Sequence, residues 1–228
     1  RGRGDLRGSL GIPDADEFVS SFDRENPFLT VEPRDNGLAQ TLAFLEGRRN
    51  QAGIIYCATR ERVDTLAAQL NDRGWPALPY HAGMDTDDRR ANQRRFSYDE
   101  APIIVATIAF GMGINKSNVR FVVHHDLPKD LESYYQQIGR AGRDGLRADC
   151  LLLYSYQDVS TITYFIDQGD LAQRPAAMAR LQAMLAFAEA NDCRRRPLLA
   201  YFGEEVIRET CDMCDNCVAG EEERIDLT

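Results

Sequence analysis

The sequence predicts an α/β fold in which a parallel β-sheet flanked by helices is followed by a small helical module with a cysteine cluster. Three observations support this prediction. Short apolar runs alternate with amphipathic stretches up to Ser155, only helical patterns follow, and four of the six cysteines lie at Cys193 or later. Alternation of strands and helices is typical of parallel sheets, because each crossover helix returns the chain to the same edge.

Each strand is predicted at a short apolar run, and each helix at a stretch in which apolar residues recur with helical spacing. The expected strands are 27–31, 53–58, 76–81, 101–107, 119–126 and 148–155. The expected helices between them are 36–47, 60–74, 85–98 and 131–142. The second helix is the most regular, because Thr59 is a good N-cap. Its inner face would carry four apolar side chains: Val63, Leu66, Ala67 and Leu70.

After Ser155 the apolar residues keep helical spacing only, which predicts helices over 156–170, 174–192 and 194–204. The second of these carries a stripe that we assign to the core: Met178, Leu181, Leu185 and Ala188. The chain thus divides into a connector or the tail of a preceding domain (1–22), the α/β domain (23–157), the helical module (158–218) and a polar tail (219–228).

The composition is that of an ordinary globular protein, with 43% hydrophobic and 28% charged residues. A formal net charge of −9 repels nucleic acid, so DNA contacts would need local basic patches. Candidates are Arg89 with Arg90, Arg94 with Arg95, and 194–196, although solvated helix faces are the simpler interpretation. The chain begins with Arg, without a signal peptide or an apolar run of membrane-spanning length. We therefore expect a fragment or processed product in the cytosol, with no membrane partner.

The spacing C-x17-C-x2-C-x2-C joins four cysteines: Cys193, Cys211, Cys214 and Cys217. Two residues between cysteines allow a tight turn to bring both sulfurs to one tetrahedral metal ion. Four thiolates would close the coordination shell, so the expected ligand is one structural Zn²⁺ that stabilises a loop too small to fold alone. An iron–sulfur cluster and two disulfide bonds are the alternatives. The other two cysteines, Cys57 and Cys150, lie in apolar runs and are expected in the core.

A further pattern is YYQQIGRAGRDG (134–145), in which Arg140 and Arg143 lie three residues apart among glycines. On a helix this spacing aims both side chains at the same side, where two guanidinium groups would bind a phosphate or a carboxylate. The 228 residues contain neither the phosphate-binding motif G-x-x-x-x-G-K-[ST] nor an acidic box to carry magnesium. The arginines are therefore predicted to be one half of a phosphate site whose other half lies elsewhere.

Parallel sheets of this kind place their working loops at the carboxyl ends of the strands. The segments YHAGM (80–84), ATIAFGMGINK (106–116) and the residues that precede QQIGRAGRDG (136–145) all fall at or soon after such ends. We therefore expect these segments to converge on one edge of the sheet.

The chain resembles the RecQ family of ATP-dependent DNA helicases in five features: YYQQIGRAGRDG, ATIAFGMGINKSNVRFVVHHDLP, IIYCATR, YHAGM and the four-cysteine tail. The resemblance covers nearly the whole chain, from SSFDRENP (20–27) to the cysteines. It implies that 23–157 is the second of two RecA-like lobes and that 158–218 is a zinc-binding module. A first lobe, with the phosphate-binding loop and the magnesium carboxylates, would be largely missing from this chain.

The resemblance also implies roles in nucleotide binding. ATP with Mg²⁺ would lie between the two lobes, and Arg143 would be the arginine finger that acts on the γ-phosphate. Arg140 would be its partner in phosphate contact or lobe coupling, and Gln136 opens the same motif. In the preceding loop Gly113 would allow close backbone approach, and Asn115 stands where many relatives have Asp. Asn115 would still accept a hydrogen bond from a ribose hydroxyl or from a partner arginine.

The resemblance further implies that three loops hold DNA. Thr107 would offer its hydroxyl and backbone to a DNA phosphate. Thr59 and Arg60 of CATR, and His81 and Gly83 of YHAG, would grip the backbone of the single strand. Thr59 is equally suited to its role as an N-cap, and the alternative role of His81 is to orient its loop.

The expected function is that of the C-terminal part of a helicase core that couples ATP hydrolysis to 3′-to-5′ movement on DNA, in repair and recombination. Its partners would be single-stranded and duplex DNA, ATP and the first lobe, in the bacterial cytoplasm at the nucleoid or in a eukaryotic nucleus. Alone, the chain is not expected to hydrolyse ATP. One alternative is a non-catalytic zinc-stabilised module that binds DNA or protein. Another is a different superfamily-two motor, such as a DEAD-box RNA helicase.

Overall fold

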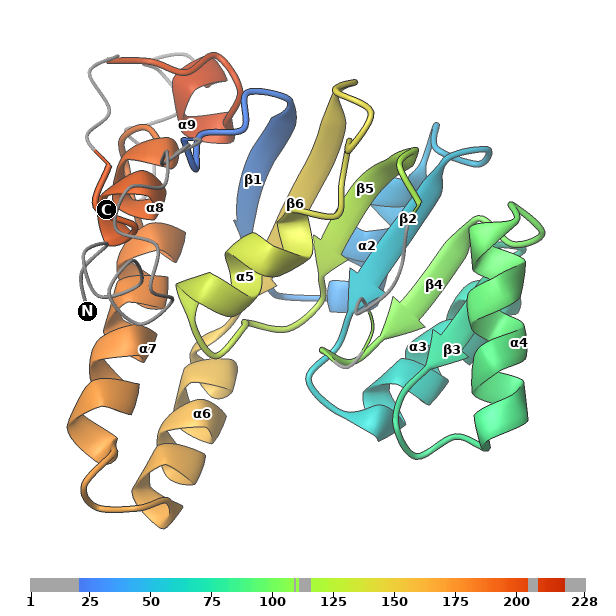
Figure 1. Ribbon diagram of the computed structural model, residues 1–228, viewed down its shortest axis with the longest axis horizontal. Coiled ribbons are helices and arrows are strands. Elements are labelled where there is room, and N and C mark those ends of the chain that lie inside the picture. The colour runs from blue at the N-terminus through green and yellow to red at the C-terminus, as the bar shows by residue number, and fades with distance from the viewer. Residues whose placement is uncertain (1–20, 109, 111–115, 205–208, 220–228) are drawn as a thin grey trace, which may run out of the picture.

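A computed structural model describes residues 21–108, 110, 116–204 and 209–219. Within them the chain forms a six-stranded sheet in the order β1-β6-β5-β2-β4-β3, and every neighbouring pair is parallel (Figure 1). The strands are β1 (Pro27–Pro33), β2 (Ala52–Tyr56), β3 (Ala77–Tyr80), β4 (Ile103–Ala106), β5 (Val119–His124) and β6 (Ala148–Tyr154). The predicted parallel sheet is confirmed, and each strand lies at a predicted apolar run.

Helices cover both faces of this sheet (Figure 1). In chain order they are α2 (Gly37–Leu45), α3 (Arg60–Asn71), α4 (Thr86–Ser97), α5 (Leu131–Ile138), α6 (Tyr156–Gln168), α7 (Arg174–Ala188), α8 (Arg195–Tyr201) and α9 (Asp215–Val218). The core between the sheet and α2 and α3 is separate from the core that joins the other face to α4, α5 and α7. The predicted order of sheet domain and helical module is therefore confirmed.

Consecutive residues of the central strands enter different cores. Ile55 and Val123 pack towards α2 and α3, whereas their neighbours Ile54 and Val122 pack towards α4, α5 and α7. All four are essentially inaccessible to solvent. A sheet buried on both faces has no polar side, which explains why its strands are continuous apolar runs in the sequence.

Helix α3 begins at the N-cap that the sequence predicts. The Thr59 hydroxyl accepts a hydrogen bond from the Arg62 backbone N–H at 3.2 Å, as an N-cap does. The four side chains expected on its inner face are all buried. Gly74 then adopts a φ of +75°, where a side chain would be strained, and the chain turns into β3.

Gly53 shows how closely the central strands and their side chains pack. A Cβ added there would lie 2.0 Å from the ring of Phe121, which is fully buried against the sheet. We expect Gly53→Ala to lower the free energy of unfolding by about 1–3 kcal/mol, because the ring has to move within a packed core. Chemical denaturation measures this loss. Adding Phe121→Leu should recover part of it, and a double variant no more stable than the additive sum contradicts the steric explanation.

The helix expected over 131–142 is shorter than predicted. α5 ends at Ile138, Gly139 is its C-cap, and Gly142 adopts a φ of +57°. Arg140 and Arg143 therefore lie in turns beyond the helix, so the directions of their side chains do not come from helical spacing as predicted. Gly139 itself keeps a helical φ of −60°, whereas the positive φ of Gly142 turns the chain away from the helical direction. The sequence pattern also missed α9, whose four residues are too few to show a period.

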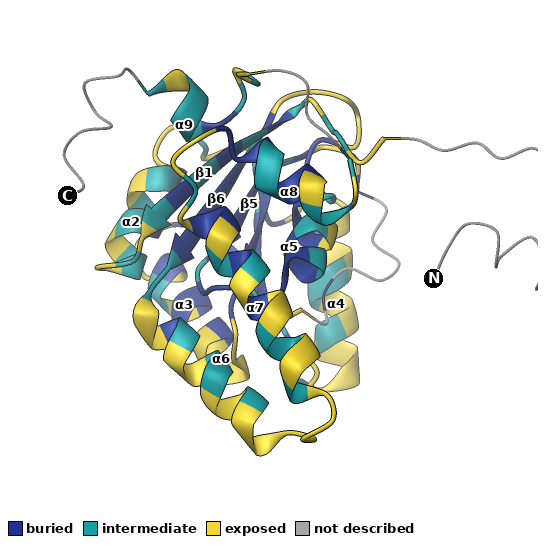
Figure 2. Cartoon of the chain, turned by 90° about the vertical axis from the view of Figure 1, so that its left-hand side faces the viewer, coloured by how far each residue is buried: buried dark blue, intermediate teal, exposed yellow. Residues whose placement is uncertain are grey.

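The helical module packs onto the sheet domain through α7. Leu181 and Ala188 are buried, and Met178 and Leu185 are half-buried against the same core, so the predicted stripe is confirmed. Phe187 of α7 meets Tyr134 of α5 with ring centroids 4.9 Å apart. The outward sides of α6 and α7 are exposed, whereas the strands behind them are buried (Figure 2). Among the described residues no helix is long and apolar enough to cross a membrane.

Candidate functional site

Three loops follow the carboxyl ends of β2, β3 and β4 and carry the residues predicted to bind DNA. Thr59 and Arg60 are exposed at the start of α3, and Thr107 directly follows β4. His81 directly follows β3 and is buried. A Cβ on Gly83 would lie 3.1 Å from the Arg60 side chain, so this arginine packs over the glycine. The structure thus brings Arg60, His81 and Gly83 together at one edge of the sheet.

Both ring nitrogens of His81 have partners within the chain. Nε2 lies 2.9 Å from a carboxylate oxygen of Asp64 on α3, and Nδ1 accepts a hydrogen bond from the Gly83 backbone N–H at 3.1 Å. Because Nδ1 accepts, the proton is on Nε2 and is donated to Asp64. This arrangement favours the loop-orienting role of His81 over a direct phosphate contact.

Thr107 begins the loop that was predicted to sense both DNA and nucleotide. Its backbone N–H donates to the backbone carbonyl of Tyr80 at 3.2 Å, and its own backbone carbonyl accepts from the Phe110 N–H at 3.0 Å. A ligand contact would therefore come from the hydroxyl rather than from this N–H. Gly113 and Asn115, assigned to nucleotide binding, lie outside the described residues.

A buried ion network at the same edge was not found in the sequence. Asp126, just beyond β5, accepts hydrogen bonds from Arg34 at 2.5 Å, from the Ala58 backbone N–H at 2.8 Å and from Arg62. The second guanidinium nitrogen of Arg34 donates to Asp158 of α6 at 2.6 Å. Charges buried to this degree persist when they are paired and hydrogen-bonded, as these are. The network fastens the helical module to the carboxyl edge of the sheet.

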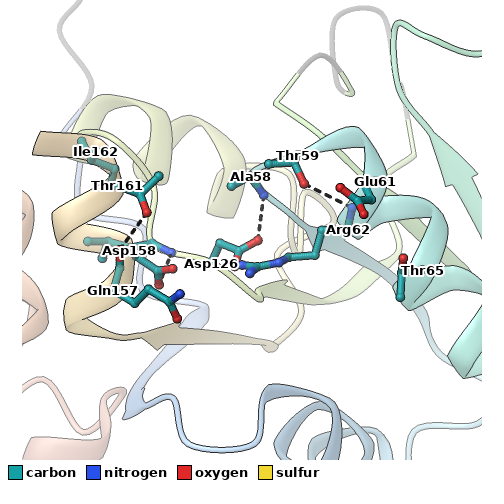
Figure 3. A pocket seen from close by; sticks show the side chains of 11 residues that line it. Ala58, Thr59, Glu61, Arg62, Thr65, Asp126, Gln157, Asp158, Thr161 and Ile162 are labelled. Carbon is teal, nitrogen blue, oxygen red and sulfur yellow. Dashed lines mark hydrogen bonds and ion pairs between the residues drawn. The ribbon is translucent and has the colours of Figure 1, made fainter. Parts of the chain in front are cut away.

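A pocket of about 440 Å³ lies beside this network (Figure 3). Three segments line the pocket: the start of α3 with Thr59, the residues just after β5 with Asp126, and α6 with Thr161. Sequence patterns could not reveal the pocket, because only the folded chain brings these separate segments together. The helical module therefore contributes one wall of the edge where the predicted DNA contacts lie.

The arginine-containing loop lies elsewhere. The Gly142 N–H donates to the carbonyl of Val119 at 2.8 Å, and Val119 is the first residue of β5. The loop backbone is thus held at the amino ends of the strands, whereas the residues that precede QQIGRAGRDG follow the carboxyl end of β5, as predicted. The cause is the direction of α5, which crosses one face of the sheet and delivers the chain to the start of β6 (Figure 1).

The Arg140 side chain reaches back across that face to the hydroxyl of Tyr56 at the end of β2. The same hydroxyl donates to the Phe110 carbonyl at 3.3 Å. Burial raises the pKa of Tyr56 to about 12, while the positive charges of Arg140 and Arg143 act to lower it. Both guanidinium groups are therefore near one buried phenol, with Arg140 half-buried and Arg143 exposed.

The two glutamines of the motif have different surroundings. Gln136 is exposed on α5, whereas Gln137 is buried and accepts a hydrogen bond from Nε2 of His124 at 2.7 Å. Burial lowers the pKa of His124 to about 4, so its ring is neutral. Gln136 is thus open to solvent, and Gln137 fixes α5 on the sheet.

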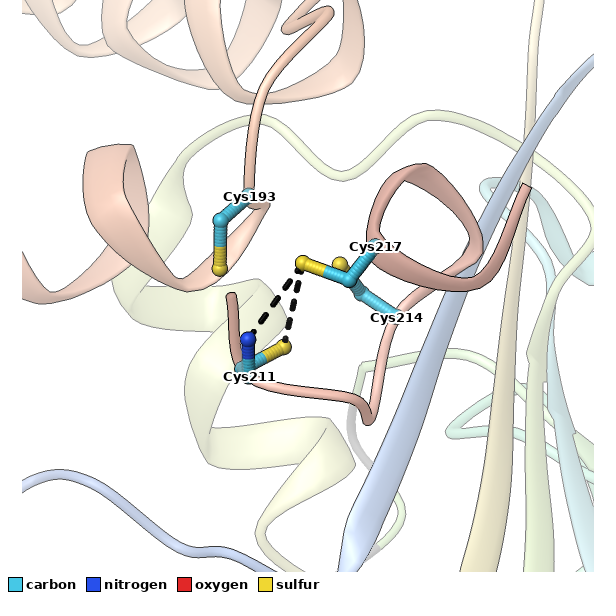
Figure 4. A group of neighbouring side chains, drawn as sticks. All are labelled: Cys193, Cys211, Cys214 and Cys217. Carbon is cyan, nitrogen blue, oxygen red and sulfur yellow. Dashed lines mark hydrogen bonds between the residues drawn. The ribbon is translucent and has the colours of Figure 1, made fainter. Parts of the chain in front are cut away.

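The sulfurs of Cys193, Cys211, Cys214 and Cys217 all lie within 4.8 Å of one another (Figure 4). A tetrahedral ion with Zn–S bonds of about 2.3 Å separates its sulfurs by about 3.8 Å. Cys211 and Cys217 match this value, with Sγ atoms 3.8 Å apart, which is far longer than a disulfide bond. The arrangement excludes the disulfide alternative in this structure and fits a single tetrahedral ion.

The chemistry of the thiols also fits a cation. Burial raises the pKa of the Cys193 thiol to about 11 and raises the pKa of Cys214 as well, so both need a positive charge to become thiolates near neutral pH. The Cys211 N–H donates to Sγ of Cys217, and the Met213 N–H to Sγ of Cys211, each at 3.4 Å. Such donors stabilise negative sulfur. Cys57 and Cys150 are buried apart from the cluster, as predicted.

The cluster is built against the edge strand β1. The Leu29 N–H donates to the carbonyl of Met213 at 3.0 Å, and the Val31 N–H to a carboxylate oxygen of Asp215 at 2.8 Å. Asp215 also accepts from Arg194, which with its neighbour Arg195 is almost fully buried. The interpretation of 194–196 as a solvated helix face is therefore wrong for these two residues, because both guanidinium groups pair with carboxylate and carbonyl oxygens inside the fold.

Two family models match the chain. The model described as helicase conserved C-terminal domain matches residues 36–145, and the model described as RecQ zinc-binding matches residues 156–218. The first match contains the three loops and both arginines, and the second contains all four clustered cysteines.

Similar proteins include several named as helicases. The ATP-dependent DNA helicase RecQ of Pasteurella multocida is 43% identical over 217 residues, which are 95% of this chain and 34% of the relative. RecQ of Bacillus subtilis is 39% identical over 93% of this chain and 36% of its own length. The helicase hus2/rqh1 of Schizosaccharomyces pombe is 41% identical over 92% of this chain and 16% of its own length. The chain thus spans about a third of the bacterial relatives that it matches.

Solved structures support the fold alone. A DEAD box protein from Methanococcus jannaschii has a TM-score of 0.56 and 24% identity over 72% of this chain and 47% of its own. SrmB of E. coli has a TM-score of 0.52 and 22% identity over 61% of this chain and 85% of its own. The sheet domain is therefore RecA-like. The chain belongs to the RecQ helicase family, of which it carries the helicase C-terminal domain and the zinc-binding region.

Proposed function

We propose that this chain is the second motor lobe of an ATP-dependent DNA helicase and supplies the arginines of an ATP site shared with another lobe. The observation that carries the proposal is the pairing of Arg140 and Arg143 on one loop, in a chain without its own phosphate-binding loop. Two guanidinium groups suit a phosphate, and a lobe that carries G-x-x-x-x-G-K-[ST] would provide the complementary half.

In this arrangement Arg143, which is exposed, stabilises negative charge on the transferred phosphoryl group. Arg140 is held against Tyr56 and joins the same phosphate site from the sheet face. Gly113 and Asn115 belong to the loop that begins at Thr107 and complete the nucleotide contacts. The relatives named ATP-dependent DNA helicases support ATP as the nucleotide.

The DNA track follows the carboxyl edge, with Thr59, Arg60 and Thr107 as its contacts. Arg60 and the exposed N-terminus of α3 offer positive charge to phosphates, although the whole chain is acidic. His81 and Gly83 shape the loop beside Arg60. Movement in the 3′-to-5′ direction would arise from opening and closing against the other lobe during hydrolysis.

The four cysteines would hold one Zn²⁺, and the tetrahedral sulfur arrangement and the RecQ zinc-binding match support this identity. With four thiolate ligands the ion has no open position, so its contribution is structural. An iron–sulfur cluster is the competing occupant. A colourless protein with one zinc per chain supports the proposal, and a brown protein overturns this part of it.

The shared ATP site predicts that the chain alone does not hydrolyse ATP. We expect no hydrolysis above a no-protein blank, with or without single-stranded DNA, because the sequence contains neither the phosphate-binding motif G-x-x-x-x-G-K-[ST] nor an acidic box to hold Mg²⁺. Joining the chain to a lobe with the phosphate-binding motif should produce DNA-stimulated hydrolysis, measured as phosphate release. Robust hydrolysis by the purified chain alone would overturn the proposal.

A further inference from the structure

A short segment connects the helical module to the arginine-containing loop. Residues 22–27, which we call the strap, lead into β1, whose first residue is Pro27, and pass between that loop and α8. Each residue of the strap has a contact to α5, to the loop over 139–146 or to the module, and Glu25 accepts a hydrogen bond from Arg195 at 3.3 Å through its backbone carbonyl. The strap carries no residue predicted to bind a ligand, so ligand binding does not explain its contacts.

Arg24 holds the backbone of the arginine-containing loop at three points. One guanidinium nitrogen donates to the carbonyl of Gly139 at 2.9 Å. The other donates to the carbonyls of Ala141 at 2.8 Å and Gly142 at 2.9 Å. These carbonyls flank Arg140 and immediately precede Arg143 in the sequence. Because α5 has ended at Ile138, the helix cannot satisfy or position them.

Asn26 completes the contact from the same side. Its side-chain amide donates to the carbonyls of Gly142 at 2.8 Å and Leu146 at 2.9 Å. The backbone carbonyl of Asn26 accepts a hydrogen bond from the Ala148 N–H at 3.2 Å. A Cβ on Gly142 would lie 2.2 Å from this amide nitrogen, so the loop and the strap are in close contact. The path of the loop is therefore fixed by the strap as well as by β5.

Arg195 of α8 anchors the strap to the helical module. Its guanidinium group donates to Asp23 at 2.6 Å and to the carbonyls of Arg24 at 2.5 Å and Pro27 at 2.9 Å. Arg195 is only 5% exposed, and it lies two residues after Cys193. A buried guanidinium that binds the strap at several points fixes both its position and its orientation.

Aromatic packing reinforces the other end of the strap. The rings of Phe22 and Phe202, which follows α8, are stacked with centroids 4.8 Å apart. The Tyr135 hydroxyl of α5 donates to the Phe22 carbonyl at 2.8 Å. The strap is thus bonded to the module on one side and to α5 and its loop on the other.

We propose that Arg24 is a positioning residue for the arginine-containing loop, and that Arg195 makes this positioning depend on the helical module. The inference rests on the proposed function, in which Arg143 acts on ATP. Precise placement is what a finger arginine requires, because small displacements of a catalytic group have large effects on rate. The cysteine module would then support hydrolysis through the strap, without touching the nucleotide.

The first experiment needs no nucleotide. Hydrogen–deuterium exchange of the chain reports on amides of 139–147, including that of Gly142. We expect Arg24→Ala to speed exchange there by about tenfold or more, because three charge-assisted hydrogen bonds are lost. Arg49→Ala is the matched control, since Arg49 also binds a backbone carbonyl, that of Gly74, but on the other side of the sheet. Unchanged exchange in Arg24→Ala would overturn the inference.

The second experiment uses the protein in which this chain follows a lobe with a phosphate-binding loop. We expect Arg24→Ala to lower kcat for DNA-stimulated hydrolysis by about 10- to 100-fold while KM for ATP changes by less than about twofold. Arg24→Lys should recover only part of kcat, because an ammonium group cannot span three carbonyls as a guanidinium does. A matched fall in thermal stability without this kinetic split would make Arg24 merely structural and overturn the positioning role.

Two outcomes separate this inference from the proposed function. If Arg143→Ala abolishes hydrolysis but Arg24→Ala leaves kcat unchanged, the strap does not position the loop, and the proposed function stands. If neither substitution lowers kcat, the loop is not catalytic, and the proposed function fails together with the inference.

The role of Arg195 is tested by Arg195→Lys, which keeps the buried positive charge beside Asp23 but cannot bind the strap carbonyls together. Faster exchange over 139–147 with unchanged zinc content supports the proposal that Arg195 makes the position of the loop depend on the helical module. Unchanged exchange would overturn the dependence on the module.

Discussion

Replacement of Arg143 by Ala is expected to lower kcat for DNA-stimulated ATP hydrolysis by about 10³- to 10⁵-fold in a protein with both lobes. An arginine finger acts on charge that develops on the transferred phosphoryl group, so its loss affects the chemical step rather than ATP binding. Because Arg143 is exposed, we expect the fold to keep its stability. Single-turnover kinetics together with ATP binding measured by calorimetry would separate the two steps.

The matched control for this substitution is Arg147→Ala. Arg147 is also exposed and lies four residues further on, but it pairs with Asp149 at 3.2 Å and stacks over Phe28. Its loss should leave kcat within about twofold of the unsubstituted protein, since an exposed ion pair contributes little to the fold. A kcat equal to that of the unsubstituted protein in both Arg143→Ala and Arg147→Ala would show that neither arginine acts on ATP, and would favour the binding-module alternative.

Cys214→Ser should have the largest effect on stability. Zinc bound by four thiolates contributes about 10–16 kcal/mol of apparent binding free energy in small zinc domains, and removing one buried thiolate sacrifices much of it. We expect the loss of zinc and the unfolding of residues 193–218, while the sheet domain stays folded on its own core. Zinc content by mass spectrometry and limited proteolysis would follow the two effects separately.

Cys57→Ala is the control for Cys214→Ser. Cys57 is equally inaccessible, but it lies in the core beneath α3 and outside the sulfur cluster. This variant should keep one zinc per chain and a protease-resistant module, at a modest cost in stability. A Cys214→Ser protein that retains both zinc and protease resistance would mean that the metal site has been assigned wrongly.

Local patterns were sufficient to predict the sheet and most helices. Thr59 and the apolar side chains after it encode α3 within one continuous segment, and the strands are continuous apolar runs. The cysteine cluster was predictable for a similar reason: two of its intervals are so short that only a tight turn can join them. Where residues close together in the sequence determine the structure, local patterns are enough to predict it.

The errors came from features that depend on distant residues. The turns after Ile138 include Gly142, whose positive φ and close contact with Asn26 no helical period reveals. The run 194–196 resembled a solvated basic face, but Arg194 and Arg195 are buried by segments far away in the sequence. The network of Arg34 with its two carboxylates was missed likewise, because its partners meet only in the folded chain.

The pairing of β1 with the cysteine-bearing loop also bears on how the protein behaves in a cell. An uncovered edge strand is a template on which a second chain can add its own strand, which is the first step of aggregation. In this fold Met213 and Asp215 occupy two backbone N–H groups of that edge, those of Leu29 and Val31. With the proposed Zn²⁺ bound, the cysteine-bearing loop stays on this edge, whereas a chain without the ion would present the edge to a second chain, so metal loading would bear on aggregation.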